Sequence, residues 1–205
     1  MVSFPKATFF IVLTFAVISL ISCTNKFFQY QVTMTHPVKS KVLEYENDTF
    51  YISFAIRYQS IKFLILNKLY DGMKINWDEV SFSINGKAQR AVHKETGVLK
   101  VNDVQPPTTI PPKSTLEDFL IPTSSLHYAT NSSNTYTIVG YILPYEESGK
   151  SKQQAVINRF KGTRITVFLP FYLGGIYHSK YYDFMIDDVI LIKNKPDPIE
   201  LPARR

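Results

Sequence analysis

The chain has 205 residues, a formal charge of +6, 45% hydrophobic residues and 14% aromatic residues. This length favours one folded domain of roughly 150 residues over two, once a leader and polar ends are set aside. The lysines and arginines are scattered rather than gathered into a stripe, which argues against a nucleic-acid partner.

The first 22 residues have the layout of an export signal. Lys6 supplies one positive charge, an uncharged apolar run extends over residues 7–21, and the small Ser22 precedes Cys23, the sole cysteine. The run is shorter than the ~20 residues that a membrane-spanning helix needs. An uncleaved anchor remains the alternative, because no further charge appears before Lys26.

The segment Leu20-Ile21-Ser22-Cys23 resembles the lipobox of bacterial lipoproteins. The resemblance implies that diacylglycerol is attached to the Cys23 thiol, that residues 1–22 are removed, and that the new N-terminus receives an acyl chain such as palmitate. Several acyl chains on one residue exceed what stable anchoring requires. Residues 23–26 then form a short tether, so the domain is expected close to the bilayer.

The body of the chain predicts short strands in succession. Residues 50–58 alternate apolar and mixed side chains, the period of a half-buried strand. Asn85-Gly86 tolerates the positive φ angles of a tight turn and predicts a hairpin between residues 80–84 and 88–93. The other strands expected in this half cover residues 27–34, 61–66 and 73–77.

Prolines interrupt the pattern after the hairpin. Gln105-Pro106-Pro107 and Pro111-Pro112-Lys113 withhold backbone donors, which predicts a long loop over one end of the domain, with residues 115–121 returning as an edge strand. A further strand is expected over 136–143, followed by a loop with a short helix near 152–159.

The last part of the domain predicts a closing hairpin. Residues 163–173 and 181–192 form its strands across Gly174-Gly175, and residues 194–205 read as a disordered tail. Strands without a sustained helical period predict an all-β fold over residues 27–193, an immunoglobulin-like sandwich of two sheets.

Three segments together resemble a family of uncharacterised bacterial envelope lipoproteins. They are Ile75 to His93 with its Trp-Asp hairpin, Gln105 to Pro122 with its Pro-Pro loop, and Gly162 to Gly175 with its late Leu-Pro strand. The resemblance covers most of the domain. It implies an envelope location and a β-rich fold, and it implies no activity, because the family has none assigned.

No catalytic, metal or cofactor motif emerges from the remaining residues. No two histidines have ligand spacing, the paired acids Asp78-Glu79 and Asp187-Asp188 point to opposite faces of a strand, and no serine lies in a nucleophile elbow. The sequence therefore predicts no metal and no cofactor. It predicts a binding or structural module that carries out no turnover. The alternatives are an envelope hydrolase whose site is built from loops, and an accessory subunit of a membrane-associated complex.

Rings and prolines are the candidate binding groups. Aromatic residues gather between Phe168 and Phe184, and about half of them should face outward by alternation. Amphipathic rings and rigid prolines suit recognition of a protein or glycan of the envelope. Thr24, rather than an acid, after Cys23 favours the outer membrane in hosts that have one. The candidate binding residues are Gln105, Pro106, Pro107, Lys113, Tyr172 and Tyr177.

The lipid anchor can be tested at Cys23. Replacing Cys23 with Ala should release the protein from membranes, because no thiol remains to carry diacylglycerol. Membrane fractionation and the mass of the N-terminal peptide measure this. The lipoprotein prediction would be contradicted if the variant stayed as membrane-bound as the unaltered protein and neither protein carried a modified N-terminal peptide.

Overall fold

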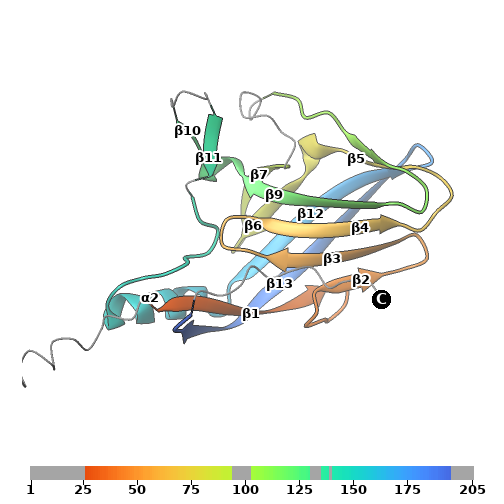
Figure 1. Ribbon diagram of the computed structural model, residues 1–205. Coiled ribbons are helices and arrows are strands. Elements are labelled where there is room, and N and C mark those ends of the chain that lie inside the picture. Colours follow the sequence, from red (N-terminus) through yellow and green to blue (C-terminus); the bar gives the residue numbers. More distant parts are fainter. Residues whose placement is uncertain (1–25, 94–102, 130–134, 139, 195–205) are drawn as a thin grey trace, which may run out of the picture.

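The computed structural model describes residues 26–93, 103–129, 135–138 and 140–194 (Figure 1). Antiparallel strands dominate it, which confirms the all-β prediction. No helix in this part of the chain is long and apolar enough to cross a membrane. Residues 23–25 of the predicted tether (23–26) and residues 195–205 of the predicted tail (194–205) lie outside the described residues.

The strands and helices follow in chain order. They are β1 (Phe27–His36), β2 (Glu44–Glu46), β3 (Phe50–Ile56), β4 (Ile61–Asn67), β5 (Met73–Ile75), the 3-10 helix η1 (Trp77–Glu79), β6 (Ser81–Ile84), β7 (Lys87–Val92), β8 (Thr108–Ile110), β9 (Thr115–Pro122), the 3-10 helix η3 (Thr123–Ser125), β10 (Leu126–Ala129), β11 (Thr135–Ile138), α2 (Lys150–Phe160), β12 (Arg164–Leu173) and β13 (Ile176–Ile192).

One curved sheet carries most of these strands and nearly closes into a barrel (Figure 1). Its hydrogen-bonded order is β1-β13-β12-β6-β7-β9-β4-β3-β2, while β10 and β11 form a separate pair. The expected immunoglobulin-like sandwich of two sheets is not confirmed. The reason is that β7 bonds β9 at Ala91–Pro122 and Val92–Ile121, which joins the strands around β12 and β13 to the strands around β3 and β4 in one continuous sheet.

Side-chain alternation builds the core inside the curve. The inward residues of β3 are Phe50, Ile52, Phe54 and Ile56, and all four belong to the same buried cluster. On β13, Tyr182 and Phe184 are buried while Tyr181 lies exposed. This matches the expectation that about half of the late aromatic residues face outward.

Local turn signals are confirmed by backbone geometry. Asn85 and Gly86 have φ angles of 49° and 78° between β6 and β7, the left-handed conformation that a tight hairpin needs. The Gly174-Gly175 turn joins β12 to β13 as predicted. The helix expected near 152–159 is α2, whose buried Phe160 joins the core.

The strand after the prolines differs from its prediction. β9 was expected at an edge, but it bonds β4 along Thr115–Leu120 and β7 at Ile121 and Pro122. Its only proline, Pro122, is the last residue of the strand, so the missing donor interrupts no central ladder. The predicted loop is also shortened, because β8 pairs with β5.

Trp77 on η1 fills the interior between β7 and β9. Its side chain is buried, its ring stacks on His93 with centroids 4.2 Å apart, and its Nε1–H donates to Thr108 Oγ1 at 2.8 Å. A buried indole with a satisfied donor contributes both packing and a hydrogen bond. Trp77 is therefore a core residue.

Replacing Trp77 with Ala should lower the free energy of unfolding by about 3–5 kcal/mol, because it empties a ring-sized space in the core. Trp77→Phe keeps part of the ring and loses only the bond to Thr108, so its loss should be smaller. Circular dichroism in denaturant measures both. An unchanged midpoint for Trp77→Ala would contradict a core role.

Candidate functional site

The anchor residue Cys23 lies outside the described residues, but the strand that follows it is placed. β1 begins at Phe27, which pairs with Ile192 at the last residue of β13. The first residue of β13, Ile176, lies 16 residues earlier on that strand. At about 3.3 Å per residue, the path along β13 from one end to the other is roughly 50 Å.

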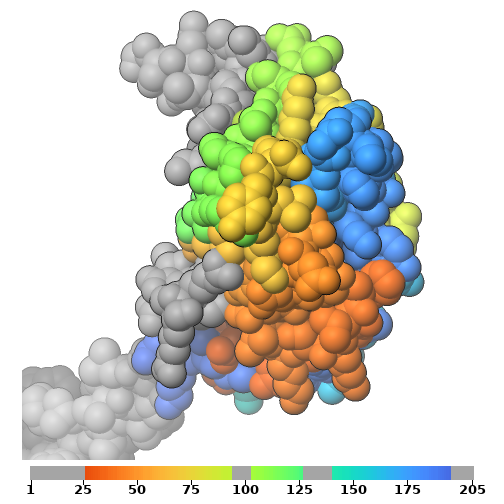
Figure 2. Space-filling model, turned by 90° about the vertical axis from the view of Figure 1, so that its right-hand side faces the viewer, coloured from red at the N-terminus to blue at the C-terminus, as the bar shows by residue number. Residues whose placement is uncertain are grey.

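Loops converge at the end far from Phe27, and we call this the tyrosine end. It comprises residues 68–72 between β4 and β5, residues 111–114 between β8 and β9, and the β12–β13 turn with its flanking residues 172–177. Figure 2 looks onto it, with the gold residues of the first loop between green and blue segments. A groove of about 460 Å³ lies there, lined by Asp71, Gly72, Lys74, Thr109, Tyr172, Gly174 and Gly175.

Exposed apolar side chains surround this groove. Tyr70 is 85% exposed, Ile176 is 67% exposed and Tyr177 is 44% exposed. Such side chains gathered at one end, beside the cation of Lys74, offer apolar contact and hydrogen bonding together.

Two contacts hold the first loop against the proline-rich segment. The Lys113 Nζ lies 4.1 Å from the centroid of the Tyr70 ring and donates to the Lys68 carbonyl at 2.5 Å. Asn67 donates to the carbonyls of Asp71 and Pro111, which ties both loops to the end of β4. Lys113 and Tyr70 thus present a ring with a cation on its face.

A second pair of rings extends the surface along β12 and β13. Tyr172 and Tyr177 face one another with centroids 5.4 Å apart in an edge arrangement. The Tyr177 hydroxyl donates to Glu79 Oε2 at 2.9 Å, and this hydrogen bond raises the pKa of Tyr177. Tyr177 therefore stays a neutral donor fixed to η1.

The other predicted binding residues are placed differently. Gln105 is buried, its side-chain amide donates to the carbonyls of Trp77 and Ala91, and its backbone N–H donates to Asp78. It holds the proline-rich segment to the barrel and is not available to a partner. Pro106 and Pro107 are exposed but precede β8, at the opposite end of that strand from Lys113. The structure thus brings together Lys113, Tyr172 and Tyr177.

The barrel interior contains a polar pair that the sequence analysis missed. His93 Nδ1 lies 3.2 Å from Asp118 Oδ2, and both side chains are only 4% exposed. The signal was present in Leu116-x-Asp118-x-Leu120, where alternation places the acid on the inward face. The Trp77 ring stacks on His93, and neither residue of the pair lines the two grooves found among the described residues.

The remaining histidines do not converge. His36 stacks on Tyr181 with centroids 4.1 Å apart on the outer face, and His178 lies 5.7 Å from the Phe171 ring. The side chain of His127 is outside the described part. Within the described residues, no group of three His, Cys, Asp or Glu side chains could hold a metal ion.

An ion pair lies on the outer face of β12 and β13. Arg164 donates to the side chain of Asp183, and Thr166 Oγ1 donates to Asp183 Oδ1 at 2.6 Å. Burial alone would raise the pKa of Asp183, but these hydrogen bonds and the positive charge of Arg164 outweigh it and lower that pKa. The carboxylate therefore stabilises the pairing of the two strands.

Comparison with known proteins finds no matching protein family, no matching curated protein and no matching solved structure. The assignment of function therefore rests on the chain's own residues and geometry.

The low pKa of Asp183 predicts a pH-dependent stability. Because the folded pKa lies below the unfolded value of about 3.9, the carboxylate stabilises the fold above that pH and loses this contribution as the pH falls through the folded pKa. Asp183→Asn should cost about 1–2 kcal/mol at pH 7, discounted for the exposed Arg164, and the cost should shrink below about pH 4. Unfolding titrations at several pH values measure it.

Asp188→Asn is the matched control. Asp188 pairs with the exposed Lys161 at the surface, and such pairs contribute little to stability. A cost for Asp183→Asn that is independent of pH would contradict the role of the charge.

Proposed function

We propose that this chain is a lipid-anchored module of the bacterial cell envelope that binds a protein or glycan at its tyrosine end and carries out no turnover. The observation that carries the proposal is the opposition of the two ends. β1 begins four residues after Cys23, and the tyrosine end lies at the far end of β13. A lipid on Cys23 would leave the tyrosine end facing away from the membrane.

The sequence and the structure support different parts of this proposal. The lipobox resemblance at Leu20 to Cys23 supports the anchor, and a charge-free leader run supports export. The groove beside Tyr172, the exposed Tyr70 and Ile176, and the cation of Lys113 support recognition. Sorting to the outer membrane, in hosts that have one, belongs to the proposal.

The binding chemistry follows from the groups at the tyrosine end. Rings bury apolar area at a small loss of side-chain entropy, and their hydroxyls and the nearby lysines supply directed hydrogen bonds. Pro111 and Pro112 stiffen the loop that presents Lys113, so less entropy is lost when a partner docks. These properties suit a folded protein of the envelope or the sugar chains of its wall.

The test compares two ends of the same molecule. The double variant Tyr70→Ser/Ile176→Ser should lose at least roughly fivefold of any partner recovered by pull-down with the full-length, membrane-anchored protein, because interfaces depend on a few large side chains. Sedimentation with purified peptidoglycan measures whether the protein binds the glycan of the wall. Tyr141→Ser is the matched control, since Tyr141 is 56% exposed but contacts Tyr145 near the start of β1.

Equal losses in both variants, or none in the double variant, would contradict binding at the tyrosine end. Turnover of an envelope glycan, peptide or lipid by the purified protein, abolished by His93→Ala or Asp118→Asn with the fold retained, would instead favour the hydrolase alternative.

A further inference from the structure

The barrel has an opening in its wall between β1 and β3. The hydrogen-bonded path through the sheet ends at β1 on one side and at β2 on the other, so β1 and β3 face one another without a direct ladder. A groove of about 560 Å³ lies there. We call this opening the seam. It is separate from the tyrosine end and does not depend on the lipid anchor.

Segments of the chain already bridge the seam at both of its ends. Near one end, Ser40 exchanges two backbone hydrogen bonds with Met34 of β1, and three residues later the Leu43 carbonyl accepts from the Phe54 N–H of β3. Extended backbone therefore fits between the two strands and bonds to both.

The other end of the seam repeats the arrangement. The Tyr145 carbonyl accepts from the Phe28 N–H of β1, and the N–H groups of Ile142 and Leu143 donate to the carbonyl of Tyr58, just beyond β3. Four residues again reach from one edge to the other. At both ends of the seam, therefore, an extended segment of polypeptide bridges β1 and β3.

The middle of the seam has backbone groups without such a partner. Phe28 and Met34 point their N–H groups away from β13, so Tyr30 and Val32 between them do so as well, because alternate residues of a strand face one edge. Ile56 has the same relation to Phe54 on β3. β13 pairs with β1 and β4 pairs with β3 on the other edge of each strand. Within the described residues, no strand pairs with these three positions on the edge that faces the seam.

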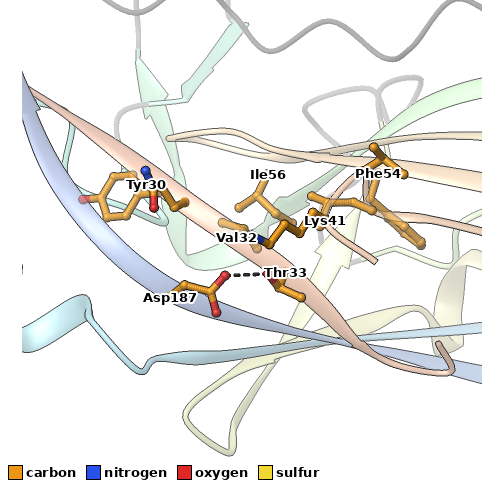
Figure 3. A pocket seen from close by; sticks show the side chains of 10 residues that line it. Tyr30, Val32, Thr33, Lys41, Phe54, Ile56 and Asp187 are labelled. Carbon is orange, nitrogen blue, oxygen red and sulfur yellow. Dashed lines mark hydrogen bonds between the residues drawn. The ribbon is translucent and has the colours of Figure 1, made fainter. Parts of the chain in front are cut away.

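The floor of the seam is apolar and its rim is charged. Figure 3 shows Val32 of β1 and Ile56 of β3 pointing toward one another, with Phe54 beside them and Lys41 over the opening. On the outer side, Thr33 donates to Asp187 at 2.5 Å. An occupant with alternating apolar and polar side chains would match this floor and rim.

We propose that the seam binds an extended segment of another polypeptide, which adds a strand between β1 and β3 and completes the barrel. Backbone groups of Tyr30, Val32 and Ile56 would pair with it, and its alternate apolar side chains would contact Val32, Phe54 and Ile56. An acyl chain would match the floor but leave the backbone groups of both edges without partners, which favours a peptide.

The probe is the peptide acetyl-Thr-Val-Thr-Val-Thr-amide, whose five residues span roughly 17 Å and so fit between Phe28 and Met34. Its matched control is the same peptide N-methylated at alternate residues, which keeps every side chain and removes the donors along one edge. The full chain in detergent, labelled with nitrogen-15, is titrated to about 1 mM of each peptide. Amide hydrogen exchange is followed by NMR.

Strand addition predicts a specific pattern of protection. The amides of Tyr30, Val32 and Ile56 should exchange rapidly alone and slow by roughly tenfold or more with the peptide, while the already bonded amides of Phe28 and Met34 should not change. The N-methylated peptide should not protect them. Val32→Pro removes one donor without breaking the β1–β13 ladder, and it should weaken binding by roughly threefold to tenfold.

Three results would overturn the proposal. The first is slow exchange of these amides without peptide, which would mean that the seam is already closed. The second is equal protection by both peptides, or protection by lauric acid alone, which would assign the groove to apolar ligands. The third is no protection by any probe. The peptide comparison uses the unaltered chain, so it decides the question even if Val32→Pro does not fold.

Discussion

The 17-residue strand β13 pairs with β1 over residues 183–192 along one edge and with β12 over residues 176–185 along the other. This double ladder links the first strand of the domain to the last and fixes the curvature of the whole sheet. Residues 176–182 extend past the end of β1, and only β12 accompanies them. The tyrosine end is therefore carried on the β12–β13 hairpin, in which β13 is the outer strand and β12 bonds β5 on its other side.

Local chemistry made much of the fold predictable. Asn85-Gly86 and Gly174-Gly175 each lie in the turn that their backbone freedom allows, and alternation at Tyr181, Tyr182 and Phe184 separates exposed from buried rings. The partner of each strand was harder to predict. Nothing in the pattern of β7 or β9 indicates that Ala91 and Val92 pair with Pro122 and Ile121, and this pairing produces one sheet in place of two.

The candidate site was predicted in part for the same reason. Tyr172 and Tyr177 are brought together by the hairpin predicted from Gly174-Gly175. Tyr70 lies at the same end because its loop contacts Lys113, which is distant in the sequence. Gln105 was misjudged because a buried amide and an exposed one look alike in a proline-rich segment. Its hydrogen bonds to the carbonyls of Trp77 and Ala91 and to the Asp78 carboxylate form only once η1, β7 and the loop meet. The seam had no signal in the sequence at all, since it is defined by a pairing that is missing.

Trp77 is the only tryptophan of the chain, and it stacks on His93 with an interplanar angle of 6°. All of the indole fluorescence of this protein therefore originates at one point in the barrel interior, against the imidazole ring of His93. Any event that parts η1 from β7, whether unfolding or a slow opening of the wall, alters that emission without an added label. The protein thus carries an intrinsic optical reporter of the integrity of its own core.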